Sequence, residues 1–292
     1  MTTAPTLQAI DHIHDSDPAG AAEGLRALVQ RGIPADELPR FCWLVNHVIG
    51  EKLGAWGEAR SILNSTVPES EDLRSLCHLA VAAHLAGDPL LAWQTADRLA
   101  AEAQVPASLS DSLIRLTTLQ FAAASLDAGS LTRMLATCVA QLSTEIEFGE
   151  LGKPIAGALN NVLSRLLEHP GAQPADAAYR HTLLDGARVC RAIWQRVGNW
   201  LNDERANYLI ALCANHVADW PAARLAAEGA LATIAQNGEE DVDRAFILLE
   251  LARALNALGE PAAAASARNT AQDLAQNFDA DLRQWFDSKA TA

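Results

Sequence analysis

The sequence has few aromatic residues and few strand formers. Only 5% of its 292 residues are Phe, Trp or Tyr, whereas half of the residues are apolar. Alanine and leucine, both strong helix formers, supply most of that apolar content. Because strands favour β-branched and aromatic residues, the composition argues against a β-sandwich or β-barrel, and its apolar content argues against a disordered chain.

Basic residues are also scarce. The chain has 22 Lys and Arg against 36 Asp and Glu, a net charge of −14, and the acidic excess runs through both halves. A uniformly acidic surface repels nucleic-acid phosphates and anionic membranes, so we expect neither as a partner.

Long apolar runs and targeting signals are missing. No stretch approaches the roughly 18 consecutive apolar residues that indicate a transmembrane helix. The beginning, MTTAPTLQAIDHIHDSD, lacks the basic and apolar regions of a secretory signal. No CxxC pair occurs, and the cysteines are typical of reduced core thiols: Cys42, Cys77, Cys138, Cys190 and Cys213. We therefore expect a cytoplasmic protein.

The motifs of common active sites are absent as well. The sequence has no GxSxG, P-loop, GxGxxG or HExxH pattern. The one dense group of histidines and acids is Asp11-His12-Ile13-His14-Asp15. In the helix that this segment predicts, His12 and His14 would point in nearly opposite directions and could not share a metal ion. We expect no catalytic residue, no metal site and no cofactor, and favour a protein that is not an enzyme.

A repeated frame is present at the turns. Five short breaks are followed by Pro or Trp at one position, and by Ala three residues later. The Pro or Trp residues are Pro18, Trp56, Pro89, Trp220 and Pro261, and the alanines are Ala21, Ala59, Ala92, Ala223 and Ala264. Small residues at this spacing allow two helices to approach closely.

The residues before these prolines favour helix starts. Asp17 and Asp88 can cap the unpaired N–H groups of the next helix, and Pro in the first position loses no hydrogen bond. Glu260 is a weaker cap that still complements the helix dipole.

Three segments resemble tetratricopeptide repeats (TPRs): GAWGEAR at 54–60, GDPLLA at 87–92, and IALCANHVADWPAARLAAEGAL at 210–231. The resemblance covers residues 40–100 and 200–277. Where the family has Tyr in the first helix, this chain has Gly50, Ala83, Ala214 and Leu255. The resemblance implies an all-α, TPR-like superhelix, a right-handed solenoid of about seven antiparallel helix pairs with a C-terminal capping helix.

Helical periods and breakers place these pairs along the chain. The expected pairs are 5–15 with 18–32, 35–53 with 56–65, 70–86 with 89–103, 108–126 with 130–143, 149–168 with 175–198, 202–218 with 221–236, and 240–258 with 261–276. Trp285 and Phe286, in the expected capping helix, should pack back on the last pair. We expect one domain, 1–292, with a hinge near 169–175 between 1–168 and 176–292.

In the TPR-like arrangement, the first helix of each pair lines a concave groove. The positions that the resemblance implies for this wall are Arg74, His84, Arg205, Tyr208, Leu212, Asn215, Arg253 and Asn256. Asn can bond a peptide backbone, and Arg can bind a carboxylate with two hydrogen bonds.

The favoured hypothesis is a non-enzymatic scaffold or adaptor, chaperone-like in its use of repeats, that binds a partner protein or peptide in the groove. A homo-oligomer is compatible with this hypothesis. Three alternatives stay open: the wall residues are ordinary solvated positions, the protein is a sensor of a small molecule or signalling peptide, or it is an enzyme with an unfamiliar site.

Overall fold

The fold is known from a computed structural model that describes residues 6–67 and 70–291. Every regular element in these residues is helical: α-helices α1 to α15, three short 3-10 turns, and one π-helix. The expected all-α fold is therefore confirmed. The chain divides into two compact units, Met1–Leu126 with Glu145–Ala158, and Asp127–Thr144 with Leu159–Ala292.

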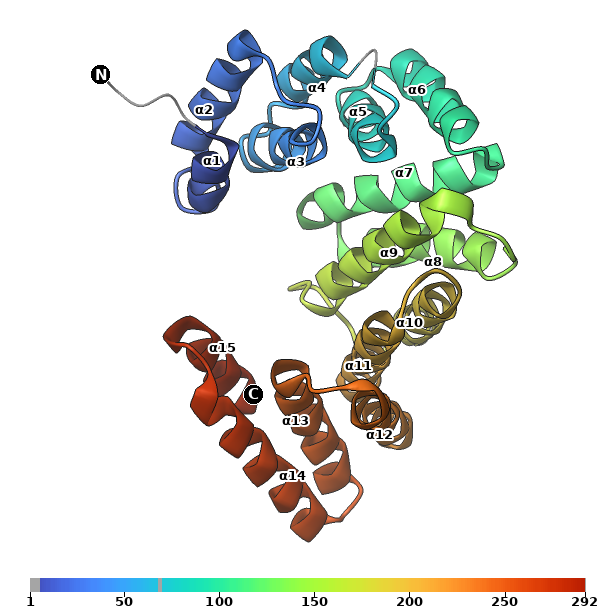
Figure 1. The fold of residues 1–292 in the computed structure, drawn as a ribbon. Coiled ribbons are helices and arrows are strands. Elements are labelled where there is room, and N and C mark those ends of the chain that lie inside the picture. The colour runs from blue at the N-terminus through green and yellow to red at the C-terminus, as the bar shows by residue number, and fades with distance from the viewer. Residues whose placement is uncertain (1–5, 68–69, 292) are drawn as a thin grey trace. The chain divides into compact units, whose positions relative to one another are not determined.

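The first unit is a succession of short helices (Figure 1). They are α1 (Leu7–Ile13), α2 (Pro18–Arg31), α3 (Leu38–Leu44), the π-helix η1 (Val45–Lys52), α4 (Trp56–Thr66), α5 (Leu73–Leu85), α6 (Pro89–Glu102) and α7 (Ala107–Ala122), with the 3-10 turns η2 (Ala123–Ser125) and η3 (Gly149–Leu151). Helix α1 packs on α2, α2 and α3 both pack on η1, and from η1 to α7 neighbours in the chain pack together. Helix α5 also packs on α3 and α7.

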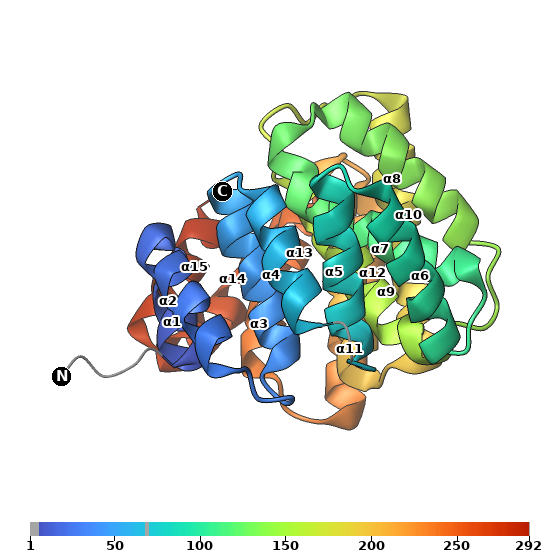
Figure 2. The same cartoon turned by 90° about the horizontal axis from the view of Figure 1, so that it is seen from above.

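The second unit contains the longer helices. They are α8 (Ala128–Leu142), the later part of α9 (Gly152–Leu167), α10 (Ala177–Val197), α11 (Trp200–His216), α12 (Trp220–Asn237), α13 (Asp241–Ala257), α14 (Pro261–Leu274), the 3-10 turn η4 (Ala275–Asn277) and α15 (Ala280–Ala290). Consecutive helices from α10 to α14 pack side by side, and α13 also packs on α11 and α15 (Figures 1 and 2).

The expected helices lie close to the observed ones, because the turns that separate them are encoded locally. Asp17 and Asp88 accept hydrogen bonds from the main-chain N–H groups of Gly20 and Leu91, at 3.0 and 3.2 Å. The following Pro residues stand at the first helical position, as expected. Glu260 makes no side-chain cap bond, so it contributes at most its charge.

Buried alanines sit at the helix contacts. The third residue after each Pro or Trp of the frame is buried in all five helices: Ala21, Ala59, Ala92, Ala223 and Ala264. Larger side chains at these positions would force the paired helices apart.

The end of the second unit is covered by α15. Phe286 is fully buried, in one apolar cluster with Phe246 and Phe278. Trp285 is half-exposed, but its ring lies 4.4 Å from that of Phe246, centroid to centroid. The prediction that the Trp-Phe pair packs back is confirmed.

The two units divide inside α9, between Ala158 and Leu159. The segment 169–175, where we expect a hinge, joins α9 to α10 within the second unit, and the hinge stays a prediction. Among the described residues, none of the helices combines the length and apolar character that a bilayer crossing requires.

Candidate functional site

The residues expected to line a groove are distributed over both units. Arg74 and His84 lie on α5 of the first unit, and both are exposed. The other positions belong to α11 and α13 in the second unit, which pack on each other. Only this second group is brought together within one unit.

Four of those residues join three carboxylates on α11 and α13. We call this set the charged cluster: Glu204, Arg205, Tyr208, Asn215, Asp243, Glu250 and Arg253. Asn256 is exposed one turn after Arg253, and Leu212 is half-buried.

Glu250 is the best-bonded member of the charged cluster. Its side chain is almost wholly buried. Nδ2 of Asn215 donates to the main-chain oxygen of Glu250 at 3.0 Å and to its Oε2 at 2.7 Å. The NH1 group of Arg253 donates to both carboxylate oxygens, at 2.8 and 2.9 Å, while its NH2 group reaches the carbonyl of Lys289. The buried carboxylate of Glu250 thus accepts hydrogen bonds from Asn215 on α11 and from Arg253 on its own helix.

A second group of contacts within the charged cluster involves Glu204, Arg205 and Asp243. Nε of Arg205 donates to Oδ2 of Asp243 at 2.8 Å and lies 3.5 Å from Oε1 of Glu204. Glu204 is fully buried, and neither of its carboxylate oxygens has a hydrogen-bond partner among the described residues. Burial, together with the neighbouring Asp243, raises the pKa of Glu204 far above its ordinary range.

Tyr208 lies between the contacts of Glu250 and those of Glu204 and Asp243. It packs on the apolar clusters around Phe246 and Ala211. Burial raises the pKa of its hydroxyl, and the charge of Glu250 adds to the increase. The phenol therefore stays protonated and can act as a hydrogen-bond donor.

The sequence predicts the two arginines, Tyr208 and Asn215 as site residues but not the carboxylates beside them. One signal was available for Glu250, which interrupts the apolar run FILLELARAL and stands three residues before Arg253, one helical turn away. Asp243 also lies in the acidic first turn of α13. Nothing in the local sequence of Glu204 indicates that it is buried.

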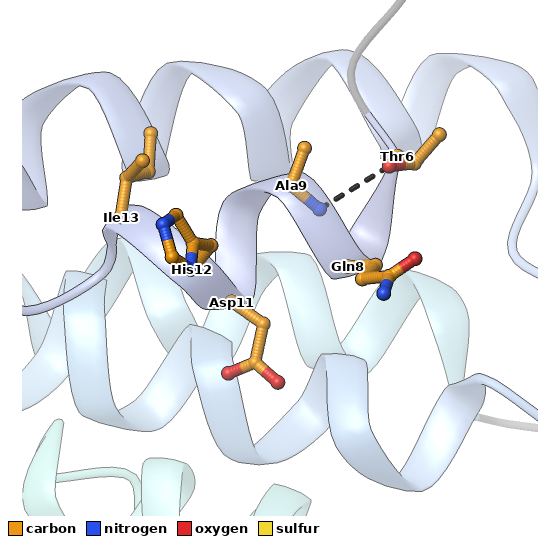
Figure 3. Close-up of a pocket in the computed structure, with 6 residues that line it drawn as sticks. All are labelled: Thr6, Gln8, Ala9, Asp11, His12 and Ile13. Carbon is orange, nitrogen blue, oxygen red and sulfur yellow. Dashed lines mark hydrogen bonds between the residues drawn. The ribbon is translucent and has the colours of Figure 1, made fainter. Parts of the chain in front are cut away.

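An open hollow lies beside α1 (Figure 3). Its lining comes from the helix and its cap: Thr6, Gln8, Ala9, Asp11, His12 and Ile13. In the view of Figure 3, Asp11 and Ile13 extend to opposite sides of the helix. The hollow exposes the surface of one short helix, so its polar groups do not converge on a common point.

A more enclosed hollow lies between α8 and α10 in the second unit. Its volume is about 340 Å³, and Ala136, Val139 and Ala140 supply apolar surface. Asp185, on its lining, is bonded by Nε2 of His181 and by NH1 of Arg188, both at 3.0 Å. This arrangement offers a half-open hollow with apolar surface on one side and a paired charge beside it.

Two further groups bear on chemistry. The five cysteines are buried free thiols, as expected, and burial raises the pKa of Cys42 and of Cys77 to about 12. Thiols of this kind are poor nucleophiles. Among the described residues, one group of His and acidic side chains has its donor atoms close enough to share a metal ion: His14, Asp15 and His47.

Comparison of the chain with protein-family models and with curated proteins finds no match.

Proposed function

We propose that the chain is a TPR-like helical-repeat scaffold that binds a partner protein or peptide through the charged cluster. The helix contacts support the repeat: α11 and α13 each pack on the helix that follows them in the chain and also on each other. The buried alanines of the shared frame support it too. Both features are typical of stacked helix pairs.

The observation that carries the binding function is that two arginines are held in place by carboxylates and are still exposed to solvent. Arg205 is held by the partly exposed carboxylate of Asp243 and Arg253 by the buried carboxylate of Glu250, yet 58% and 35% of the arginine side-chain surfaces are exposed. Among the described residues, the terminal amino groups of Arg205 have no hydrogen-bond partner, since only Nε bonds Asp243. A guanidinium that is already oriented loses little freedom when it binds a carboxylate.

The arrangement changes the role that we assign to Asn215. Because its side-chain amide is committed to Glu250 and the residue is buried, it holds the acidic side chain in place rather than the peptide. Recognition is then assigned to the arginines and the Tyr208 hydroxyl, which suits a peptide that presents a carboxylate. We also propose a cytoplasmic protein, on the support of its reduced, buried thiols.

The test uses the full chain as bait, immobilised in parallel with two variants. In the first variant, Arg205→Gln is combined with Arg253→Gln; in the control, the exposed Arg268 of α14 carries Arg268→Gln. We expect a partner that the wild type and the control retain and that the double variant loses, with unchanged helical circular dichroism. A partner held equally by all three proteins would contradict the assignment of the charged cluster.

The hollow between α8 and α10 favours one second candidate, a sensor of a small amphipathic anion. Its apolar surface can accept a hydrocarbon chain, and Arg188, which is paired with Asp185 but more than half exposed, lies on the lining to receive a carboxylate. Octanoate is a simple probe, and it should raise the melting temperature of the wild type but not of an Ala140→Trp variant, whose side chain fills the hollow. Equal melting shifts in both proteins would exclude this site.

A further inference from the structure

A histidine pair and an aspartate meet where the turn after α1 approaches the π-helix η1. His14 and Asp15 belong to the turn, and His47 belongs to η1. One donor atom from each of the three lies within 4.8 Å of the other two. From these residues we infer a site for a divalent transition-metal cation of the Zn²⁺ class in the first unit.

The distances between the donor atoms match a metal site better than they match hydrogen bonds. Nε2 of His14 lies 3.4 Å from Oδ2 of Asp15, and Nε2 of His47 lies 3.5 Å from Oδ1. A charge-assisted hydrogen bond would bring such atoms to about 2.8 Å. Two ligands of a tetrahedral zinc ion, each bonded at about 2.0–2.1 Å, stand about 3.3 Å apart. Each Nε2 atom therefore lies at about the distance from an Asp15 oxygen that separates two ligands of one metal ion.

The Nδ1 atoms of both imidazoles are held by oxygen acceptors. Nδ1 of His47 is 2.6 Å from Oε2 of Glu51, and Nδ1 of His14 is hydrogen-bonded to the main-chain oxygen of Asp11. An oxygen acceptor at Nδ1 places the proton there and leaves the Nε2 lone pair available. Metal-binding histidines commonly have such partners, which orient the ring and increase its basicity.

Aromatic packing fixes the planes of the two rings. Trp43 stacks on His47 with centroids 4.7 Å apart, and its ring stands nearly perpendicular to that of His14, with centroids 5.6 Å apart. The guanidinium of Arg40 lies 4.1 Å above the Trp43 ring and is paired with Asp11, whose carbonyl holds His14. The orientations of the two histidine ligands are thus held by their packing, as binding sites with defined geometry require.

The local backbone is also unusual. His47, Glu51 and Lys52 all belong to the π-helix, a form that is rare in proteins and is frequently found at functional sites. His47 is nearly buried, whereas 70% of the Asp15 side chain is exposed, so an ion can enter from solvent. A water molecule can complete the coordination on that open side.

Lys52 is the competitor for the same carboxylate. Its Nζ lies 2.6 Å from Oδ1 of Asp15. A metal ion at the site has to displace the ammonium group, which leaves through solvent because 29% of its side chain is exposed. Removing the lysine should therefore strengthen metal binding, whereas it would weaken a site in which the lysine is part of the structure.

The donor set indicates which cations fit. Two imidazole nitrogens and one carboxylate oxygen suit Zn²⁺, Co²⁺, Ni²⁺ and Cu²⁺, and are poor ligands for Ca²⁺ or Mg²⁺. A bound ion would connect the α1–α2 turn to η1, so we assign to it a stabilising role in the first unit. The charged cluster lies in the other unit, which keeps this inference independent of the proposed function.

The experiment is a metal titration of the full chain after treatment with EDTA and dialysis. We expect calorimetry with ZnCl₂ to show one ion per chain with a dissociation constant of about 10 µM or tighter. Co²⁺ should give visible absorption bands typical of tetrahedral coordination. Asp15→Asn should weaken Zn²⁺ binding more than about 100-fold, and Glu51→Gln about 10–100-fold. Lys52→Met should bind Zn²⁺ more tightly than the wild type does.

The controls are two exposed histidines. His12→Ala removes the neighbouring imidazole of α1, and His181→Ala removes a histidine of the second unit; both should bind Zn²⁺ as the wild type does. Because Asp15 is exposed, its variant tests the site even if His47→Ala fails to fold. No binding at 100-fold the expected dissociation constant, unchanged affinity in Asp15→Asn, or weaker binding in Lys52→Met would each overturn the assignment.

Discussion

Asn215 donates from one amide nitrogen to both the main-chain oxygen and the carboxylate of Glu250, at 3.0 and 2.7 Å. The contact joins α11 to α13, and Arg253 binds the same carboxylate from within α13. A buried acidic side chain is therefore held by one neutral and one charged donor. The stability of this contact depends on both.

Asn215→Ala should destabilise the protein strongly. The substitution removes both hydrogen bonds that α11 donates to Glu250, and a hydrogen bond to a charged group contributes about 1.5–3 kcal/mol. Asn256→Ala is the matched control on an exposed position and should change the free energy of unfolding by less than about 0.5 kcal/mol. Urea denaturation followed by circular dichroism measures both, and equal free energies would show that the buried amide contributes nothing.

Glu204 should make the folded state less stable as pH rises. Burial raises the pKa of this carboxyl to about 8 from an ordinary 4.5, so between these values the folded state binds more protons than the unfolded state. The free energy of unfolding therefore falls with increasing pH across this window, and the full penalty is present above about pH 8. Below pH 4.5 the penalty is absent.

The variant that isolates this effect is Glu204→Gln, which stays neutral at every pH. Melting temperatures of the wild type and the variant, compared from pH 5 to pH 8, should diverge in favour of the variant as pH rises. Parallel curves would mean that Glu204 is already ionised at the lower pH.

Gly50→Ala should be destabilising because of one aromatic ring. A Cβ atom at residue 50 would stand 2.3 Å from Cζ3 of Trp56, and a forced fit of this kind costs about 1–3 kcal/mol. Gly57→Ala, in an open position of α4, should instead stabilise by about 0.5–1 kcal/mol. In a Trp56→Leu background the cost of Gly50→Ala should largely disappear, and an unchanged cost there would exclude the clash as its cause.

The cysteines should be unreactive in the folded protein. Burial raises the pKa of Cys42, Cys77 and Cys190 to about 12, so at pH 8 almost none of their thiolate is present. A disulfide-exchange reagent such as DTNB should modify the five thiols only after guanidinium unfolding. Rapid modification of any cysteine under native conditions would contradict the burial described for it.

Much of the helical layout could be predicted from the sequence because its signals are local. Asp17 with Pro18, and Asp88 with Pro89, specify helix starts by capping and by the restricted φ of proline, so they act wherever the helices finally pack. The buried alanines follow from the same frame. Gly50 lies against the ring of Trp56, which fills the space that a side chain at residue 50 would need.

Much of the candidate site could not be predicted in this way. Glu204 and Asp243 meet only because α11 packs on α13, and their positions in the sequence carry no sign of it. The spacing of His12 and His14 argues against a shared metal ion, but His47 comes close to His14 only through the packing around Trp43. The π-helical turn that carries His47 has no signature of its own in the residues 45–52.

The position of Phe286 has a consequence for assembly. Stacked helix pairs leave an apolar surface at each end, and a second chain could stack on such a surface and begin a filament. In this chain α15 lays Phe286 into the cluster formed by Phe246 and the alanines of α14, and the exposed residues of α15 include Asp281 and Asp287. Helix α15 therefore covers apolar surface of α13 and α14 that a second chain could otherwise contact.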